Sequence, residues 1–445
     1  MDKKNPILII VMLFLVFTFS LHVSGEKQFV PNRVVVKMKA VEKAETSGET
    51  AGREPGQLVK ETHPAAMLQL KYRPAIQGIH SHRIKDYYII DTVEGCDVEA
   101  LSETLRHESS VIDASPDYYA VISSTVPNDP YFQYQYSLIN VGQVFLPESG
   151  LSGTSGSDIK ATEGWDWATG SEEVIIAIVD SGVASDHEDL EGKVLPGRNY
   201  VDNSDNAYDD HGHGTMMASI AAAWTDNGVG VAGVSWHSRI LPVKTMASDG
   251  YGSYLAIAEG IRYAAENGAH VINLSVGGRN PSFILEDACE FAFGQGAVIV
   301  AAAGNVNSSV DYPAAYDDYC IAVAATDSND ERIFWSNYGP QVDVAAPGNY
   351  IWGAMFYPDE PGNLNSYGWG TGTSVASPIV SGAAALLIGY KPSLSNTQVM
   401  NLIKYTADDV NASTHPGVDD YLGYGRLNLR TLLGPYELNG QGSTK

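Results

Sequence analysis

The sequence predicts an α/β protein with a doubly wound parallel sheet and helices on both faces, preceded by a smaller α+β unit. Between Val174 and Ala325, short apolar runs rich in β-branched and small residues alternate with helical segments. These runs are continuously apolar, as expected for parallel strands buried on both faces. The 445 residues suffice for one large and one small domain.

Residues 1–25 have the pattern of a secretory signal peptide. The basic pair Lys3-Lys4 precedes the apolar run from Ile7 to Phe19, and small residues follow this run. The alternative is a membrane anchor, but the apolar run is short for a membrane-spanning helix. We therefore expect export of the chain and leave this segment out of the fold.

Residues 27–123 form the predicted small α+β unit. Short β-branched or aromatic runs predict strands, and a run with helical spacing predicts one helix. A polar, charged segment between the first two strands predicts a loop. The predicted elements are strands 33–38 and 87–91, the loop 40–64, helix 98–105 and a closing strand pair within 111–121.

Residues 127–435 form the predicted main domain, and 436–445 a C-terminal tail. A Gly/Ser-rich segment at 150–157 predicts a surface loop, and residues 142–157 read as an insertion without an assigned role. The predicted strands are 174–179, 240–244, 271–274, 297–302 and 320–325; the predicted helices are 213–223, 253–267, 284–293, the one that begins near Ser374, and 396–407.

The charge balance restricts the partners. The chain has 27 basic and 53 acidic residues, a net charge of −26. This argues against nucleic acid or an anionic membrane as a partner, because both are negatively charged. It is typical of a soluble, secreted protein that binds cations, and we expect a monomer.

The cysteines leave one question open. Of Cys96, Cys289 and Cys320, the last two are the pair that would remain in the main domain. Export permits a disulfide between Cys289 and Cys320, and two buried free thiols are the alternative, since the sequence does not give the geometry of a bridge.

A glycine turn at Gly370 to Gly372 leads into an apolar segment that predicts a buried central helix beginning near Ser374. Pro378 is expected in the first turn of this helix, where its missing N–H costs nothing. Ser374 is either a helix-capping serine or a nucleophile placed at the positive end of the helix dipole.

Two further candidates lie upstream. Asp180 follows the strand 174–179, and the carboxyl ends of parallel strands are where ligands bind in open α/β sheets. His213 begins a helix of small residues with a glycine on each side. Taken alone, the aspartate is equally a turn cap and the histidine equally structural.

Four segments occur in an order that identifies a family. They are Asp180-Ser-Gly, His213-Gly-Thr, Ala303-Gly-Asn305 and Gly372-Thr-Ser-Val-Ala-Ser-Pro378. The chain resembles the subtilisin-like serine peptidases, thermitase-type branch, over about residues 128–433. The resemblance implies a subtilisin-like fold in which Ser374 is the nucleophile, His213 its base, Asp180 the partner of the imidazole, and Asn305 an oxyanion donor in place of a plain turn residue.

The resemblance also implies where a peptide substrate would bind as an added strand. Ser275 and Gly277 belong to one wall, and Gly250 and Gly252 to the other. Tyr254 would line an outer apolar pocket. Asp311 would lie at the base of the primary pocket and make basic side chains acceptable there; the alternative is that Asp311 points into solvent.

Calcium is the cofactor that the resemblance implies, because carboxylate, amide and carbonyl oxygens in loops suit this ion. Asp202 belongs to a second, weaker group with Asn199 and Asp205, for which a solvated acidic loop is the favoured interpretation. The first site would be formed by Asp129, Asp189, Thr225, Asn227, Val229 and Val231.

The resemblance further identifies the small unit as a ferredoxin-like prodomain that inhibits the enzyme within the same chain. The predicted protein is a secreted serine endopeptidase that cleaves protein or peptide substrates and processes itself, with the junction between Val121 and Val126. A catalytically inactive binding protein on the same fold is the alternative. An α/β-hydrolase esterase is disfavoured, since the serine comes last in the chain.

Overall fold

The computed structural model describes residues 29–39, 76–81, 86–118, 125–357 and 363–434. The chain divides into two compact units, 1–123 and 124–445. The predicted signal peptide, the predicted loop 40–64, most of the predicted processing junction and the predicted tail 436–445 lie outside the described residues.

The first unit is a four-stranded antiparallel sheet with a helix. The strands follow the order β2-β3-β1-β4 and comprise β1 (Phe29–Met38), β2 (Ile76–Ser81), β3 (Tyr87–Thr92) and β4 (Val111–Tyr118). Helix α3 (Val98–Arg106) begins after Asp97, whose side chain accepts a hydrogen bond from the Ala100 N–H. Its apolar side packs on the sheet through Leu101 and Leu105. This arrangement is α+β, as predicted.

The second unit is built on a parallel seven-stranded sheet of order β13-β12-β11-β10-β7-β9-β8. The central strands contain almost only Val, Ile, Leu and Ala, and nearly all of these residues are buried. The strands are β7 (Ile175–Asp180), β8 (Arg198–Asn199), β9 (Arg239–Lys244), β10 (Val271–Leu274), β11 (Val298–Ala302), β12 (Cys320–Thr326) and β13 (Val344–Pro347).

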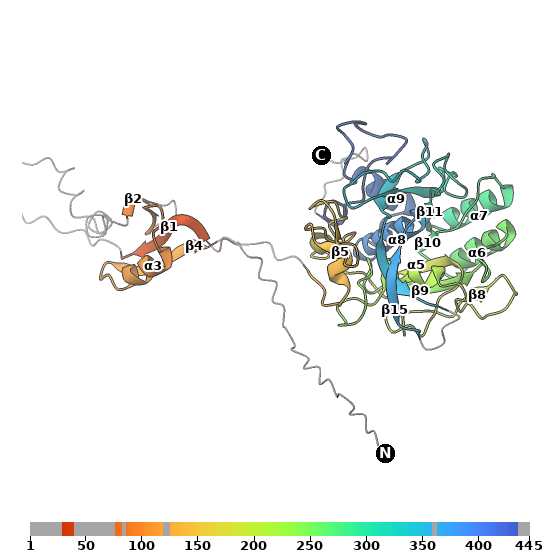
Figure 1. Ribbon diagram of the computed structural model, residues 1–445, viewed down its shortest axis with the longest axis horizontal. Helices are drawn as coiled ribbons and strands as arrows, with labels where there is room; N and C mark the ends of the chain where they lie inside the picture. Colours follow the sequence, from red (N-terminus) through yellow and green to blue (C-terminus); the bar gives the residue numbers. More distant parts are fainter. Residues whose placement is uncertain (1–28, 40–75, 82–85, 119–124, 358–362, 435–445) are drawn as a thin grey trace, which may run out of the picture. The chain divides into compact units, whose positions relative to one another are not determined.

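Helices cover both faces of this sheet, which confirms the predicted α/β architecture. Alternate strand residues point to opposite faces: Ile176 packs in the core with the first set of helices, and Ala177 in the core with the second. The first set is α5 (His213–Ala222), α8 (Thr373–Tyr390) and α9 (Asn396–Tyr405); the second is α6 (Tyr254–Glu266) and α7 (Phe283–Gly294). Figure 1 shows α6 and α7 side by side.

Helix α8 is the central helix of the unit. It contacts β10, β11, β12 and β13 as well as α5, and most of its side chains are completely buried. Among the described residues it is also the helix long and apolar enough to cross a membrane, but here it is a core helix. The prediction for Pro378 was wrong: it is the sixth helical residue and lies inside the helix, beyond the first turn.

Several elements differ from the predictions. The segment after Val111 forms one strand, β4, where we expected a strand pair. Strands β2, β8 and β13 were not predicted, nor were the antiparallel ribbon of β14 (Ile351–Met355) and β15 (Ser366–Gly370) and the short hairpin of β5 (Val144–Leu146) and β6 (Leu151–Ser152). Cys289 and Cys320 are buried free thiols, the second of the two alternatives.

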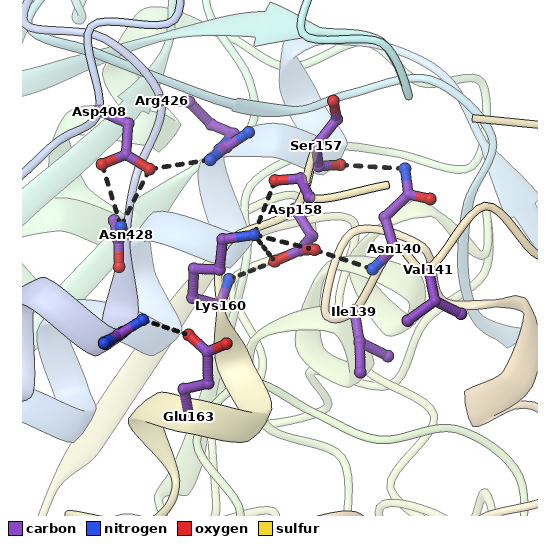
Figure 2. A network of polar contacts seen from close by, with 12 residues as sticks. Ile139, Asn140, Val141, Ser157, Asp158, Lys160, Glu163, Asp408, Arg426 and Asn428 are labelled. Atoms are coloured by element: carbon purple, nitrogen blue, oxygen red, sulfur yellow. Dashed lines mark hydrogen bonds and ion pairs between the residues drawn. The ribbon is translucent and has the colours of Figure 1, made fainter. Parts of the chain in front are cut away.

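The buried carboxylate of Asp158 holds the C-terminal end of the insertion-like segment, residues 142–157, in place. Asp158 accepts hydrogen bonds from the backbone N–H groups of Asn140 and Lys160, and the Lys160 ammonium lies 3.3 Å from it (Figure 2). In the same view, Asp408 binds Arg426 and Asn428. These contacts fix loops of the second unit by satisfying buried polar groups.

Contacts between distant parts of the sequence close the second unit. The Tyr136 hydroxyl donates to the Asn349 carbonyl oxygen, 213 residues away. The Trp352 indole N–H donates to the Phe145 carbonyl oxygen, 207 residues away. These two bonds join the first segments of the unit to residues 349–352, at the start of the β14–β15 ribbon.

Candidate active site

Three of the predicted catalytic residues lie at the ends of three central elements. Asp180 is the last residue of β7, His213 is the first residue of α5, and Ser374 is the second residue of α8. Helix α5 packs against both β7 and α8, so the fold brings these three ends together. All three residues line one cleft with a volume of about 410 Å³.

Asp180 and His213 are hydrogen bonded. The distance from His213 Nδ1 to Asp180 Oδ1 is 2.7 Å, and Asp180 is only 1% exposed. Partial burial of the imidazole opposes its protonation, but the Asp180 carboxylate outweighs this effect, so the pKa of His213 is raised above its ordinary value. The bond uses Nδ1 and leaves Nε2 for a second partner.

At the start of α8, the Ser374 carbonyl group has a side chain as its hydrogen-bond donor. In a regular helix the Ser374 C=O would accept a bond from the N–H of residue 378, and Pro378 has no N–H. The Ser275 hydroxyl donates to the Ser374 carbonyl oxygen instead, at 2.7 Å. The interior proline therefore leaves an acceptor that ties the start of α8 to the segment after β10.

Asn305 lies beside Ser374 with a fixed side chain. Its Oδ1 accepts from the Thr373 N–H at 2.8 Å and from the Thr373 hydroxyl at 3.0 Å. These bonds orient the amide and leave the Nδ2 group available. A side chain at Gly372, whose φ is +155°, would place its Cβ 2.8 Å from Ser374 Oγ and 3.3 Å from Asn305 Nδ2. Glycine thus keeps the space between the two groups open.

Some of the residues predicted to bind the substrate line this cleft, and others do not. Gly250, Ser275 and Gly277 line it. Gly252 lies outside this lining; it is exposed, and a Cβ there would come 2.4 Å from the Thr245 carbonyl oxygen. Tyr254 also lies outside it; its hydroxyl packs on Gly278, 2.3 Å from where a Cβ would stand.

Asp311 lines the cleft and does not point away into solvent. Its carboxylate packs on Gly304, because a Cβ on that glycine would lie 2.4 Å from Asp311 Oδ2. Partial burial raises the pKa of Asp311, and the positive charge of Arg279 lowers it to a smaller extent.

The residues of the first predicted calcium site come together around two buried carboxylates. Asp129 Oδ1 is buried and has no hydrogen-bond partner in the described part of the chain, whereas Oδ2 accepts from the Asp226 N–H at 2.8 Å. Burial, with a smaller contribution from Asp129, raises the pKa of Asp189 to about 7. Two adjacent buried carboxylates and an unpartnered oxygen suit a hard divalent cation.

The loop residues of that site surround Asp189. Asp189 accepts from the Val231 N–H at 2.8 Å and from the Asn227 amide at 3.2 Å. Asn227 Oδ1 accepts from the Val229 N–H, and the Thr225 hydroxyl donates to the Ala223 carbonyl oxygen. Asn227 and Val231 of this loop therefore lie against Asp189, and the residue types of the predicted site supply the oxygen ligands that calcium prefers.

The second group, around Asp202, is a self-contained turn. Asp202 Oδ1 accepts from the Ser204 N–H, Asn199 Oδ1 accepts from the Val201 N–H, and Asp205 pairs with Arg198 at 2.6 Å. No group of three or more His, Cys, Asp or Glu side chains suited to a metal occurs among the described residues. The favoured interpretation of a solvated acidic loop agrees with these contacts.

Three residues of this region were not predicted from the sequence. His211 lines the cleft, and its ring centroid lies 6.3 Å from that of His213. Asp209, in the loop that leads to His213, and Lys244, which donates to Asp210 of that loop, are both buried. Their types, a loop aspartate and a strand-end lysine, gave no signal, because their importance depends on contacts between segments about 30 residues apart.

Comparison with known proteins decides the family. The profile of the subtilase family matches residues 171–425. The chain belongs to the subtilase family. It is 42% identical to thermitase of Thermoactinomyces vulgaris over 68% of this chain and 97% of that protein. It is 39% identical to the thermophilic serine proteinase of Bacillus sp. strain AK1, over 74% of this chain and 75% of that protein.

Solved structures agree with this family. A protease from Pseudoalteromonas arctica PAMC 21717 matches with a TM-score of 0.60 and 28% identity, over 69% of this chain and 99% of that one. A cold-adapted subtilisin-like serine proteinase matches with a TM-score of 0.53 and 26% identity, over 69% of this chain and 98% of that one. This subtilase is a serine endopeptidase with a subtilisin-like fold, as the sequence predicted.

Proposed function

We propose that this subtilase cleaves peptide bonds through Asp180, His213 and Ser374, and that it is made as a secreted precursor that processes itself. The observation that carries the proposal is the 2.7 Å bond between Asp180 and His213 in a cleft that Ser374 and Asn305 also line. These groups supply a base, a nucleophile and an oxyanion donor within one site.

The proposed reaction has two halves. Ser374 Oγ attacks the peptide carbonyl carbon while His213 Nε2 takes the hydroxyl proton; the same proton then goes to the leaving amine, and an acyl-enzyme remains. Water, deprotonated by His213, hydrolyses this ester and restores Ser374. Asp180 holds the imidazole orientation and stabilises its charged form throughout.

Asn305 Nδ2 and the Ser374 N–H are the proposed donors to the oxyanion. The orientation of Asn305 by Thr373 supports this role, because the donor is fixed before the substrate arrives and needs no reorganisation. The adjacent Gly372 leaves room for the oxygen that develops in the transition state.

Peptide binding would occur along the cleft walls at Ser275 to Gly277 and Gly250. Gly278 already exchanges two backbone hydrogen bonds with Tyr312, at 2.9 and 2.8 Å, which keeps this wall extended. The cleft position of Asp311 supports our proposal that the primary pocket accepts Lys and Arg as well as large apolar side chains. Gly252 and Tyr254 lie outside the cleft lining, so they would contact a substrate only beyond the primary pocket.

Calcium is proposed as a structural ion held by Asp129, Asp189 and the oxygens of the 225–231 loop. When bound, it would supply positive charge between two buried carboxylates. Without it, the two carboxylates repel each other, and Asp129 Oδ1 has no partner within the described residues. The site lies at loops of the second unit and takes no part in proton transfer.

Residues 27–123 are proposed as an inhibitory prodomain, and residues 1–25 as the export signal. The separate compactness of the first unit supports the first proposal. One relative is a cell wall-associated protease of Bacillus subtilis, and another is an extracellular serine protease of Natrialba magadii, which supports the second. Family membership favours this enzyme over an inactive binding protein.

The deciding experiment is mass spectrometry of the secreted wild type beside Ser374→Ala. We expect the wild type to lose about 120 residues, in line with the boundary between units at Ser123 and Ser124, and the variant to lose only the proposed export signal and keep the proposed prodomain. Equal trimming of both would mean that another protease matures the chain. A full-length wild type that cleaves no peptide would contradict the proposed function.

A further inference from the structure

Asp209 is a buried carboxylate that the proposed reaction does not use. It is 1% exposed and lies four residues before His213, in the loop that leads into α5. Its Oδ1 accepts from the His211 N–H at 3.0 Å, the Gly212 N–H at 2.9 Å and the Ser181 hydroxyl at 2.8 Å. Its Oδ2 accepts two more, so five hydrogen bonds converge on this side chain.

The second oxygen of Asp209 caps helix α5. Oδ2 accepts from the Thr215 N–H at 2.9 Å and from the Thr215 hydroxyl at 2.6 Å. The N-cap residue of α5 is Gly212, which has no side chain to perform this function. Asp209 takes over the capping and so fixes the first turn of the helix, of which His213 is the first residue.

Ser181 connects this cap to the strand that carries Asp180. Its hydroxyl donates to Asp209 and accepts from the Gly214 N–H at 2.9 Å, and its own N–H donates to Asp180 Oδ1 at 2.7 Å. Ser181, the residue after Asp180, is thus hydrogen bonded to Gly214, the residue after His213, and to the Asp209 carboxylate.

Lys244 makes a second connection between the same two segments. It is 3% exposed, and its ammonium donates to the Ser181 carbonyl oxygen at 2.7 Å, the Asp210 carboxylate at 2.6 Å and the Met246 carbonyl oxygen at 2.9 Å. Strand β9 pairs with β7 so that Lys244 stands directly opposite Asp180. All three donors of the ammonium are used.

We propose that Asp209, Ser181 and Lys244 form a clamp that positions His213 against Asp180, with Asp209 as the principal positioning residue. The clamp joins the end of β7 to the start of α5, two elements whose relative placement sets the 2.7 Å contact between the imidazole and the Asp180 carboxylate. This inference rests on the proposed function of His213 as the catalytic base.

The charge of Asp209 supports the same role. Partial burial opposes protonation of His213, whereas Asp180 and then Asp209 favour it and together raise its pKa. Among the described residues, the His211 ring also lies near the imidazole, and Asp210 of the same loop is paired with Lys244. Asp209 is therefore placed to stabilise the imidazolium through space while it fixes the ring through α5.

The test is the pH profile of kcat/KM for Asp209→Asn in the matured enzyme. The isosteric amide removes the charge and places an NH2 group against the Thr215 N–H. We expect kcat at the plateau to fall about 10- to 100-fold, KM to change less than about twofold, and the acidic limb to move to lower pH. The limb moves because loss of a negative charge lowers the pKa of His213.

Asp343→Asn is the matched control. Asp343 is also a buried carboxylate, accepting from the Ala322 N–H at 2.9 Å and pairing with Lys404 at 3.1 Å, but it lies outside the cleft lining. We expect it to lower the thermal midpoint while kcat and the acidic limb stay unchanged. A folded Asp209→Asn enzyme that behaves in the same way would show a structural cap only and overturn the inference.

Ser181→Ala gives an independent answer if Asp209→Asn does not fold. It breaks the connection to Asp209 but keeps the Asp209 charge, so kcat should fall while the acidic limb stays in place. Wild-type kcat in Ser181→Ala would overturn the clamp. If the matured wild type neither hydrolyses peptides nor reacts with a fluorophosphonate, the proposed function fails; if it does both, these variants test the clamp alone.

Discussion

At the scale of single residues, Asn305 offers a direct test of transition-state stabilisation. Its Oδ1 accepts from Thr373, which fixes the amide, and Nδ2 is the group that can donate to the oxyanion. Asn305→Ala should lower kcat by about 10²- to 10³-fold and leave KM nearly unchanged, because the lost bond forms mainly in the transition state.

The control for this prediction is Asn267→Ala. Asn267 is the C-cap residue of α6, and its amide donates to the Tyr263 carbonyl oxygen at an exposed position. Steady-state kinetics of both variants on one peptide should give a loss of kcat for Asn305→Ala alone. A matching rise in KM with unchanged kcat would instead assign Asn305 to ground-state binding.

Asp311 is the residue expected to set the primary preference. In Asp311→Asn, the ratio of kcat/KM for a Lys substrate to that for a Phe substrate should fall about tenfold, since one nearby charge is removed. Burial raises the pKa of Asp311, so in the wild type this ratio should fall as pH drops and the carboxylate is protonated. Kinetics on paired peptides that differ only at this position would measure both effects.

An unchanged ratio in Asp311→Asn would show that Asp311 does not contact the bound side chain. Glu148→Gln is a suitable control, because Glu148 is an exposed carboxylate outside the cleft lining and pairs with the Trp369 indole N–H. The ratio of kcat/KM for the Lys substrate to that for the Phe substrate should be the same in Glu148→Gln as in the wild type.

The residues predicted from sequence were those that belong to local motifs. Asp180, His213, Asn305 and Ser374 each lie in a short segment with its own glycine or small-residue pattern, and the fold brings all four to one cleft. Asp209 carried no such signal. Its contacts run to Ser181, 28 residues away, and a distance of that kind is visible only when β7 and α5 are in place.

At the scale of elements, the first turn of α8 depends on a side-chain donor that replaces a missing backbone N–H. Pro378 supplies no N–H to the Ser374 carbonyl oxygen, and Ser275 donates instead. Ser275→Ala should lower the free energy of unfolding by about 1 kcal/mol, because a partly buried acceptor loses its partner. Urea unfolding in the Ser374→Ala background, where self-digestion is blocked, would measure this change.

The double variant Ser275→Ala/Pro378→Ala provides the control. Alanine at 378 restores an N–H that can reach the Ser374 carbonyl oxygen within the helix, so the double variant should recover roughly 1 kcal/mol relative to Ser275→Ala. Purely additive losses would mean that the carbonyl group finds water or another donor when Ser275 is absent.

Elements with a strong period were predicted well, and short antiparallel strands were not. Helix α6 follows its capping residue Ser253, and β10 has the predicted bounds. Strands β14 and β15 were missed because Ile351–Met355 and Ser366–Gly370 contain glycines and aromatic residues without clear alternation. Such a ribbon is defined by pairing with its partner, as the register of Trp352 opposite Trp369 shows.

At the scale of the whole molecule, calcium should link loop structure to stability. In the full-length Ser374→Ala protein, calcium at about 100 times its dissociation constant should stabilise the folded state by about 2.7 kcal/mol relative to excess chelator. Asp129→Asn should abolish most of this response, because it removes the charge of an otherwise unpartnered buried carboxylate. Scanning calorimetry at a fixed scan rate would measure the midpoints.

Asp202→Asn is the matched control, since Asp202 lies in a turn whose oxygens already have backbone partners. Its calcium response should equal that of the parent. If both variants respond like the parent, calcium binds elsewhere and the assignment to Asp129 and Asp189 is wrong.

The long-range contacts that close the second unit have a consequence for how long the enzyme would survive after the proposed export. Tyr136 and Trp352 each bond to backbone more than 200 residues away, so these contacts form late and at high entropic cost. We therefore expect a chain of this topology to fold slowly. If it also unfolds slowly, its working lifetime in a protease-rich medium is set by its rate of unfolding. The equilibrium between folded and unfolded forms then has little influence on that lifetime.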